Sequence, residues 1–146
     1  MAMITDDGTV EVVPLAVLTF VVGSLVLAHA WGVMAARATT AAAAREGARA
    51  FVEAPPDAAL TAAESAAAAR VRHPTAGRTP DGPTSTVVVS GGTGRCEPIS
   101  VRVSTVVPFL SLPWIGPLGS VPVAATHQQV VDPYRAGLPG QARCAS

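Results

Sequence analysis

The chain has 146 residues; ten are arginine, none is lysine and ten are acidic, so its formal net charge is zero. A chain without a basic excess gives no support for nucleic acid as a partner. Apart from one membrane segment, roughly 110 residues remain, which excludes anything larger than one small domain.

The first element is an uncharged apolar segment, Val12–Ala36, which follows an acidic flank ending at Glu11 and precedes Arg37. As a helix, its roughly 25 residues would reach about 37 Å, enough to cross a bilayer with some tilt. We therefore predict a short N-terminal flank over residues 1–11 and a transmembrane helix over 12–36. The chain is then a single-pass membrane protein.

A stretch of this segment, Ala28-His29-Ala30, is similar to the cleavage site of a secretory signal peptide. The preceding flank carries no positive charge, however, and the apolar run continues through Trp31 and Met34. Both features favour a retained anchor over a cleaved signal, and a secreted domain is the alternative. His29 is ionisable, but we expect that lipid headgroups solvate it and that it has no further role.

The sequence does not decide on which side of the membrane the rest of the chain lies. The positive-inside rule places a basic flank in the cytoplasm, and Arg37, Arg45 and Arg49 follow the apolar segment. Two cysteines and a strand-rich tail favour an exported domain instead.

Alanine-rich helices are expected after the membrane segment, over residues 37–72. Alanine has the highest helix propensity, so Ala38–Glu53 should continue the first helix until Pro55 ends it. Asp57 can cap a second helix that runs to about Arg72. Gly47 would allow these two helices to approach closely.

The composition then changes to that of a loop over residues 73–85, followed by a small β domain with a C-terminal tail over 86–146. Three strands are predicted, at Thr86–Ser90, around Ile99–Thr105 and at Val123–Val131, with a glycine-rich turn at Gly91–Gly94. The later two should pair antiparallel with the first beside them. Helices first and strands second give an α+β fold.

An apolar, proline-rich connection, Pro108–Gly119, precedes the last strand. It holds Phe109, Leu110, Trp114 and Ile115. These side chains either fold back as the lid of a small core or form a contact surface for a partner subunit or the membrane.

Cys96 and Cys144 are the only cysteines, and an even pair in an exported domain is most simply a disulfide. Two free thiols are the alternative. Closing a loop of this length would stabilise the domain by roughly 3 to 4 kcal/mol.

No set of residues indicates an active site. The three histidines are scattered and lack metal-ligand spacing, and the glycine-rich turn lacks the lysine and following helix of a phosphate-binding loop. We therefore predict no enzyme activity, no metal and no cofactor.

Two sequence elements carry a family resemblance. Asp7–Leu15 (Asp-Gly-Thr-Val-Glu-Val-Val-Pro-Leu) precedes the apolar helix, and Ala44–Arg49 (Ala-Arg-Glu-Gly-Ala-Arg) follows it. Together with a cysteine that leads into an alternating valine strand, this combination resembles the TadE-like family of tight-adherence (Tad, Flp-type) pilus proteins. The resemblance covers most of the chain.

The resemblance implies a pseudopilin-like minor component of a pilus machine, with a cytoplasmic N-terminus and an exported domain. Its partners would be the membrane, other pilins or pseudopilins, inner-membrane platform proteins with an assembly ATPase, and a prepilin peptidase. Glu11 and Pro14 match the family's helix start, and Glu11 would meet a neighbouring subunit during assembly. Cleavage would fall between Gly8 and Thr9, but Gly8 precedes Glu11 by three residues rather than the family's five, so we expect an uncleaved anchor.

A membrane-tethered or secreted binding module with no role in a pilus is the alternative function. Such a module would share only the topology with pilus proteins. It should tolerate replacement of Glu11, whereas an assembly subunit should not.

Overall fold

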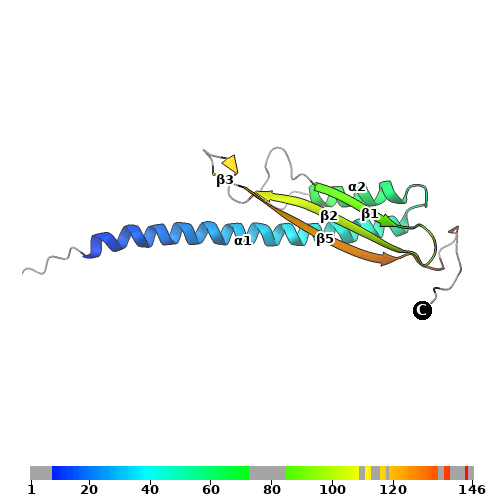
Figure 1. Cartoon of the computed structure of the whole chain (residues 1–146), viewed down its shortest axis with the longest axis horizontal. Coiled ribbons are helices and arrows are strands. Elements are labelled where there is room, and N and C mark those ends of the chain that lie inside the picture. The colour runs from blue at the N-terminus through cyan, green and yellow to red at the C-terminus, as the bar shows by residue number, and fades with distance from the viewer. Residues whose placement is uncertain are drawn as a thin grey trace, which may run out of the picture.

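The chain forms an α+β structure in the computed structural model (Figure 1), which describes residues 8–72, 85–108, 111–112, 116–117, 119–134, 137–138 and 144. Its elements are α1 (Gly8–Glu53), α2 (Ala59–Arg72), β1 (Ser85–Gly91), β2 (Pro98–Pro108), β3 (Ser111–Leu112), β4 (Gly116–Pro117) and β5 (Ser120–Val130). The predicted fold class is confirmed: a long N-terminal helix, a shorter second helix and an antiparallel three-stranded sheet.

Helix α1 is one continuous helix of 46 residues. Its C-terminal half packs against α2 and the sheet, while its N-terminal half extends beyond them (Figure 1). The helix ends at Glu53, just before Pro55, as predicted, because a proline cannot donate the next helical hydrogen bond.

The predicted cap of α2 is wrong. Asp57 is exposed and its carboxylate makes no capping hydrogen bond within the described residues. A turn leads into the helix instead: the amide of Ala58 donates to the carbonyl of Pro55 at 3.0 Å, and the amide of Ala62 donates to the carbonyl of Ala58 at 2.9 Å. The carbonyl of Ala58, one residue after Asp57, thus accepts the first hydrogen bond of the helix.

The main sheet has the strand order β1-β2-β5, with both pairs antiparallel. Along β2, buried and exposed residues alternate, which confirms the predicted period of two. Ile99, Val101 and Val103 are buried on the face that α1 and α2 cover, and Arg102 points to the open face. The burial of one face fixes the register of the strands.

The turn between β1 and β2 falls at the predicted glycines. Gly91 has φ +122°, a conformation that side chains with a Cβ rarely adopt, and a Cβ there would contact the carbonyl oxygen of Pro98. Glycine is therefore required at this hairpin. The carboxylate of Glu97 accepts a hydrogen bond from the amide of Gly94 at 2.9 Å, which closes the turn.

Among the described residues, the core contains small aliphatic side chains and one aromatic ring, that of Phe51, which is 2% exposed. The remaining members of this cluster come from both helices, β2 and the C-terminal part of the chain: Ala43, Ala44, Ala48, Ala59, Ala63, Ala67, Val71, Ile99, Val101, Val103, Val131 and Leu138. Alanine faces allow the helices to lie close to each other and to the sheet.

Beyond the main sheet, β3 and β4 form a two-residue antiparallel ladder in which Ser111 pairs with Pro117 and Leu112 with Gly116. The ladder lies within the connection from β2 to β5, which the sequence predicted only as an irregular apolar stretch. Figure 1 shows β3 at the end of the sheet that lies beside the middle of α1.

Candidate functional site

The N-terminal half of α1 exposes apolar side chains without interruption. Every residue from Val12 to Ala28 is exposed, with Phe20 at 76% and Leu27 at 73%. Within the described part of the chain, this is the one helix long and apolar enough to cross a membrane. Helical geometry satisfies its backbone polar groups internally, as a lipid environment demands. This half of α1 is thus compatible with a single membrane span.

The residues that the family resemblance singles out lie at the start of this helix. Gly8, Thr9 and Glu11 form its first turn, and Pro14 lies inside it. Pro14 removes one backbone hydrogen bond, to the carbonyl of Val10, without ending the helix. A carboxylate in the first turn of a helix is favoured by the helix dipole, typically by about 0.3 to 1 kcal/mol.

Polar side chains of α1 are satisfied locally. The hydroxyl of Thr19 donates to the carbonyl of Leu15 at 2.8 Å, and that of Thr40 donates to the carbonyl of Ala36 at 2.7 Å. Such bonds to the preceding turn let hydroxyls reside in an apolar environment at low cost. They also leave these hydroxyls without a free donor for a ligand.

His29 marks a change along the helix. It is half-buried, as are Gly32, Val33 and Ala36, whereas the residues before it are exposed. The uninterrupted exposure of α1 therefore ends at His29.

Beyond the apolar half, α1 carries charged residues on its outer face. The Nε of Arg49 donates to Oε1 of Glu53 at 2.8 Å, which realises one of the pairings that the sequence allows at this spacing. The hydrogen bond and charge of Glu53, together with the charge of Glu46, raise the pKa of Arg49 above its ordinary value. Both partners are largely exposed, so solvent screens the pair and its contribution to stability is small.

A shallow open groove runs along the outer seam between α1 and α2. Its lining consists of three alanines and three charged residues: Ala42, Ala66, Ala69, Arg45, Glu46 and Arg70. No group of three or more histidine, cysteine, aspartate or glutamate side chains able to hold a metal occurs in the described ranges.

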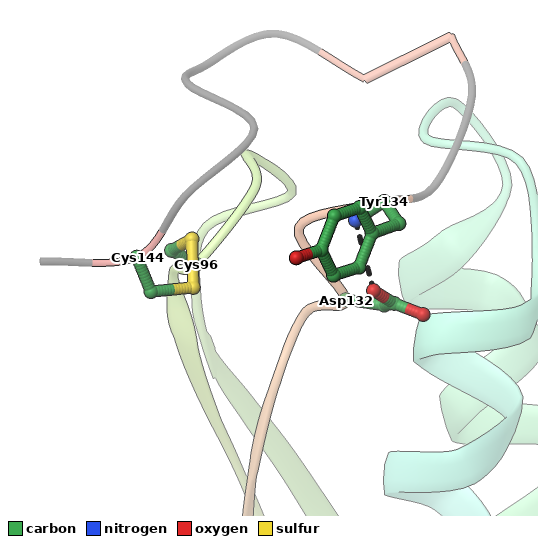
Figure 2. Close-up of a disulfide and its surroundings, with 4 residues drawn as sticks. All are labelled: Cys96, Asp132, Tyr134 and Cys144. Atoms are coloured by element: carbon green, nitrogen blue, oxygen red, sulfur yellow. Dashed lines mark hydrogen bonds between the residues drawn. A yellow bond between two sulfur atoms is a disulfide. The ribbon is translucent and has the colours of Figure 1, made fainter.

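Cys96 and Cys144 form a disulfide, with a Cα–Cα distance of 5.2 Å (Figure 2). Cys96 lies in the turn between β1 and β2, with φ +64°. Its amide donates to the carbonyl of Val131 at 3.0 Å, and the amide of Val131 donates to the carbonyl of Glu97 at 3.1 Å. The turn is thus held both to the chain after β5 and, covalently, to the C-terminal segment.

The chain after β5 makes a further local turn near this disulfide (Figure 2). The amide of Tyr134 donates to Oδ1 of Asp132 at 2.9 Å. The ring of Tyr134 is 81% exposed. Asp132 therefore shapes the backbone here rather than serving a ligand.

The predicted interaction patch, Phe109, Leu110, Trp114 and Ile115, lies outside the described residues. The structure therefore does not test whether these four side chains form a lid or a contact surface.

The sequence analysis did not predict that exposure differs among the residues of α1 between His29 and Ala36. Half-buried and exposed residues alternate there, and the large side chains that stay exposed are Trp31 at 76% and Met34 at 70%. The sequence does contain a signal for this row of exposed side chains, because Leu27, Trp31 and Met34 have the spacing of one side of a helix.

Comparisons with protein-family models, with curated proteins and with solved structures give no match for this chain.

Proposed function

We propose that this chain is a TadE-like minor pilin or pseudopilin, a structural component of a tight-adherence pilus machine in the cell envelope. The observation that supports this most is the continuity of α1, which joins an exposed apolar half to the core of the domain without a break.

An unbroken helix has a mechanical consequence. The same 46-residue element enters the membrane and contributes Ala43, Ala44, Ala48 and Phe51 to the core of the domain. The orientation of the domain therefore follows that of the membrane helix. A subunit that packs against its neighbours through this helix needs such coupling, whereas a binding module on a tether does not.

The disulfide supports an exported domain. Disulfides persist in oxidising compartments and are rare in the cytoplasm. The Cys96–Cys144 bond thus outweighs the basic residues that follow the apolar segment, Arg37 among them. On this basis the N-terminus is cytoplasmic, the helix spans the cell membrane once, and the α+β domain is outside it or in the pilus.

Glu11 is the residue to which the proposal assigns a role between subunits. In the first turn of α1 its charge would meet the positively charged N-terminal end of a neighbouring helix during assembly. The partners are other pilins or pseudopilins, the platform proteins and their assembly ATPase. A prepilin peptidase is a further partner if the chain is cut between Gly8 and Thr9.

Complementation of a deletion strain tests the proposal. We expect Glu11→Ala to insert into the membrane at the wild-type level but to reduce surface pili, counted by electron microscopy, to the level of the deletion strain. Glu64→Ala is the matched control, because Glu64 is an exposed acidic residue of α2, far from the helix start in the sequence. It should restore pili fully.

Two results would contradict the proposal. One is a deletion strain that retains its pili, and the other is a Glu11→Ala variant that restores them as well as Glu64→Ala does. Either result would favour the membrane-tethered binding module.

A further inference from the structure

Helix α2 runs back toward the half of α1 that is compatible with a membrane span. Near the end of α1, Phe51 lines the same small cavity as Ala59, the first residue of α2. Further back along α1, Ala42 lines the outer groove together with Arg70. Figure 1 shows α2 alongside the C-terminal half of α1. The two helices are therefore antiparallel, and the C-terminal end of α2 is its end nearest the membrane.

The last residue of α2, Arg72, can be placed along the axis of α1. A Cβ at Gly47 would lie 3.1 Å from the carbonyl oxygen of Ala63 and 3.2 Å from Cβ of Ala67, so Gly47 faces α2 between these two residues. Arg72 lies roughly seven residues beyond that point on α2, and rise per residue is the same in both helices. Arg72 therefore comes level with about Thr40 of α1.

With α1 as the span, the surface of the hydrocarbon core falls between Trp31 and Arg37. Trp31 lies about 30 Å along the helix from Val12, and Arg37 is the first charged residue after the apolar segment. Measured along α1, Arg72 stands roughly 5 to 14 Å outside the hydrocarbon core. The headgroup layer is about 5 to 8 Å thick, and charges act over a further Debye length of about 8 Å. Arg37 and Arg72 are thus close enough to interact with lipid headgroups.

The charges of the domain are distributed unequally along this axis. Among the described residues, the carboxylate of the domain nearest the membrane is that of Glu46, about 9 Å beyond the level of Arg72. None of Arg37, Arg70 and Arg72 forms an ion pair in the described part of the chain. All three are exposed. The end of the domain nearest the membrane therefore carries positive charge that these carboxylates do not neutralise.

Arginine at the end of a helix also has a local role, because its charge complements the helix dipole. The Nε of Arg72 donates to the carbonyl of Ala68 at 3.2 Å. That bond uses one of the five N–H donors of the guanidinium. The planar guanidinium matches the geometry of a phosphate group, so the local role leaves donors that a phosphate can use.

We propose that Arg37, Arg70 and Arg72 form a headgroup-binding face, which binds the phosphates of anionic phospholipids. Charge complementarity identifies this partner, because an anionic headgroup layer attracts basic residues within about a Debye length of its surface. The inference requires that α1 spans a membrane. It requires neither pilus assembly nor a particular orientation of the domain.

Quenching of Trp31 by brominated lipids tests this contact. Trp31 is 76% exposed, and it precedes Ala42, which lines the groove with Arg70, by about three helical turns, so both residues lie on nearly the same side of α1. Trp114→Phe makes Trp31 the single reporter. The full-length variant is placed in vesicles of phosphatidylcholine and phosphatidylglycerol in fixed proportion, with bromine on the acyl chains of one lipid or of the other. The ratio of the two quenching efficiencies measures the preference for the anionic lipid.

We expect this preference to fall roughly threefold or more in Arg70→Gln/Arg72→Gln, because each basic residue near an anionic surface contributes up to about fivefold. Arg70→Lys/Arg72→Lys retains the charge and should keep most of the preference. Arg49→Gln/Arg102→Gln is the matched control. It removes the same charge from two exposed residues at or beyond the level of Gly47, and the preference should stay unchanged. Circular dichroism checks the fold of each variant.

Several outcomes would overturn the inference. Equal quenching by both lipids, or an unchanged preference in Arg70→Gln/Arg72→Gln, would show that these arginines do not bind headgroups, although the span and the proposed function would remain. An equal loss in Arg49→Gln/Arg102→Gln would assign the effect to net charge rather than to position.

Two further results would exclude lipid as the partner. If Arg70→Gln/Arg72→Gln keeps the lipid preference but loses surface pili, a protein binds these arginines instead. If neither lipid quenches Trp31, α1 does not span the membrane, and the proposed function fails together with the headgroup-binding face.

Discussion

Both helices and the sheet come close together at Gly47. A Cβ at this position would lie 3.1 Å from the carbonyl oxygen of Ala63, 3.2 Å from Cβ of Ala67 and 3.2 Å from Cγ1 of Val101. One of these neighbours is a backbone atom, which cannot move without shifting α2. The absence of a side chain here is a packing requirement of the fold.

Replacement of Gly47 should therefore destabilise the domain. We expect Gly47→Val to lower the free energy of unfolding by roughly 1 to 3 kcal/mol, the usual cost of overpacking a core. Guanidinium unfolding of the detergent-solubilised protein, followed by circular dichroism, measures it. Gly23→Val is the control, since a Cβ at Gly23 meets nothing within 4 Å and should leave that free energy unchanged. Equal stability of both variants would contradict the packing described.

Phe51, near the end of α1, is the one large ring among the described core residues, whose other side chains are small. We expect Phe51→Ala to cost about 3 to 5 kcal/mol, because small neighbours cannot fill the space it leaves. The same unfolding experiment measures the loss. Leu60→Ala on α2, at 53% exposure, serves as the reference and should cost far less. A loss no greater than that of Leu60→Ala would show that the core does not depend on Phe51.

At the scale of elements, the disulfide connects the β1–β2 hairpin to the C-terminal segment across a sequence separation of 48 residues. The chain-entropy estimate for such a loop is about 4 kcal/mol. We expect reduction, or a Cys96→Ser/Cys144→Ser double variant, to lower the free energy of unfolding by that order. Thermal unfolding with and without reductant measures the change. No shift in the midpoint would mean that the bond contributes little to a domain already held by its sheet.

The elements differ in how well their sequences predicted them. The alternation from Ile99 to Thr105 predicted β2, because only one face of that strand is buried. Pro55 predicted the end of α1 for an equally local reason. The ladder of β3 and β4 was not predicted, since its two-residue strands are too short to show a period.

Two other features are not determined by the local sequence. Asp57 has the residue type and spacing of a cap, yet the carbonyl of Ala58 accepts the first hydrogen bond of α2. The half-burial of Val33 was not predicted either, because an apolar side chain has the same pattern in sequence whether it is exposed or partly buried. The sequence therefore predicted a membrane helix but not where along it the exposure falls.

At the scale of the whole molecule, the proposed function requires a helix that stays in the membrane and carries an exported domain closed by a disulfide. A single exposed apolar helix-half and a covalently closed domain are consistent with that arrangement. Retention of the helix distinguishes this arrangement from a secreted domain. Oxidation of the cysteines distinguishes it from a cytoplasmic domain.

The most direct measurement is the intact mass of the protein extracted from its native membrane, alkylated with and without prior reduction. The account predicts a chain that retains Val12–Ala36, either whole or beginning at Thr9, in which Cys96 and Cys144 are alkylated only after reduction. A mass that begins at Trp31 would show a secreted domain. Alkylation of both cysteines without reduction would place the domain in the cytoplasm, and either result would contradict the account.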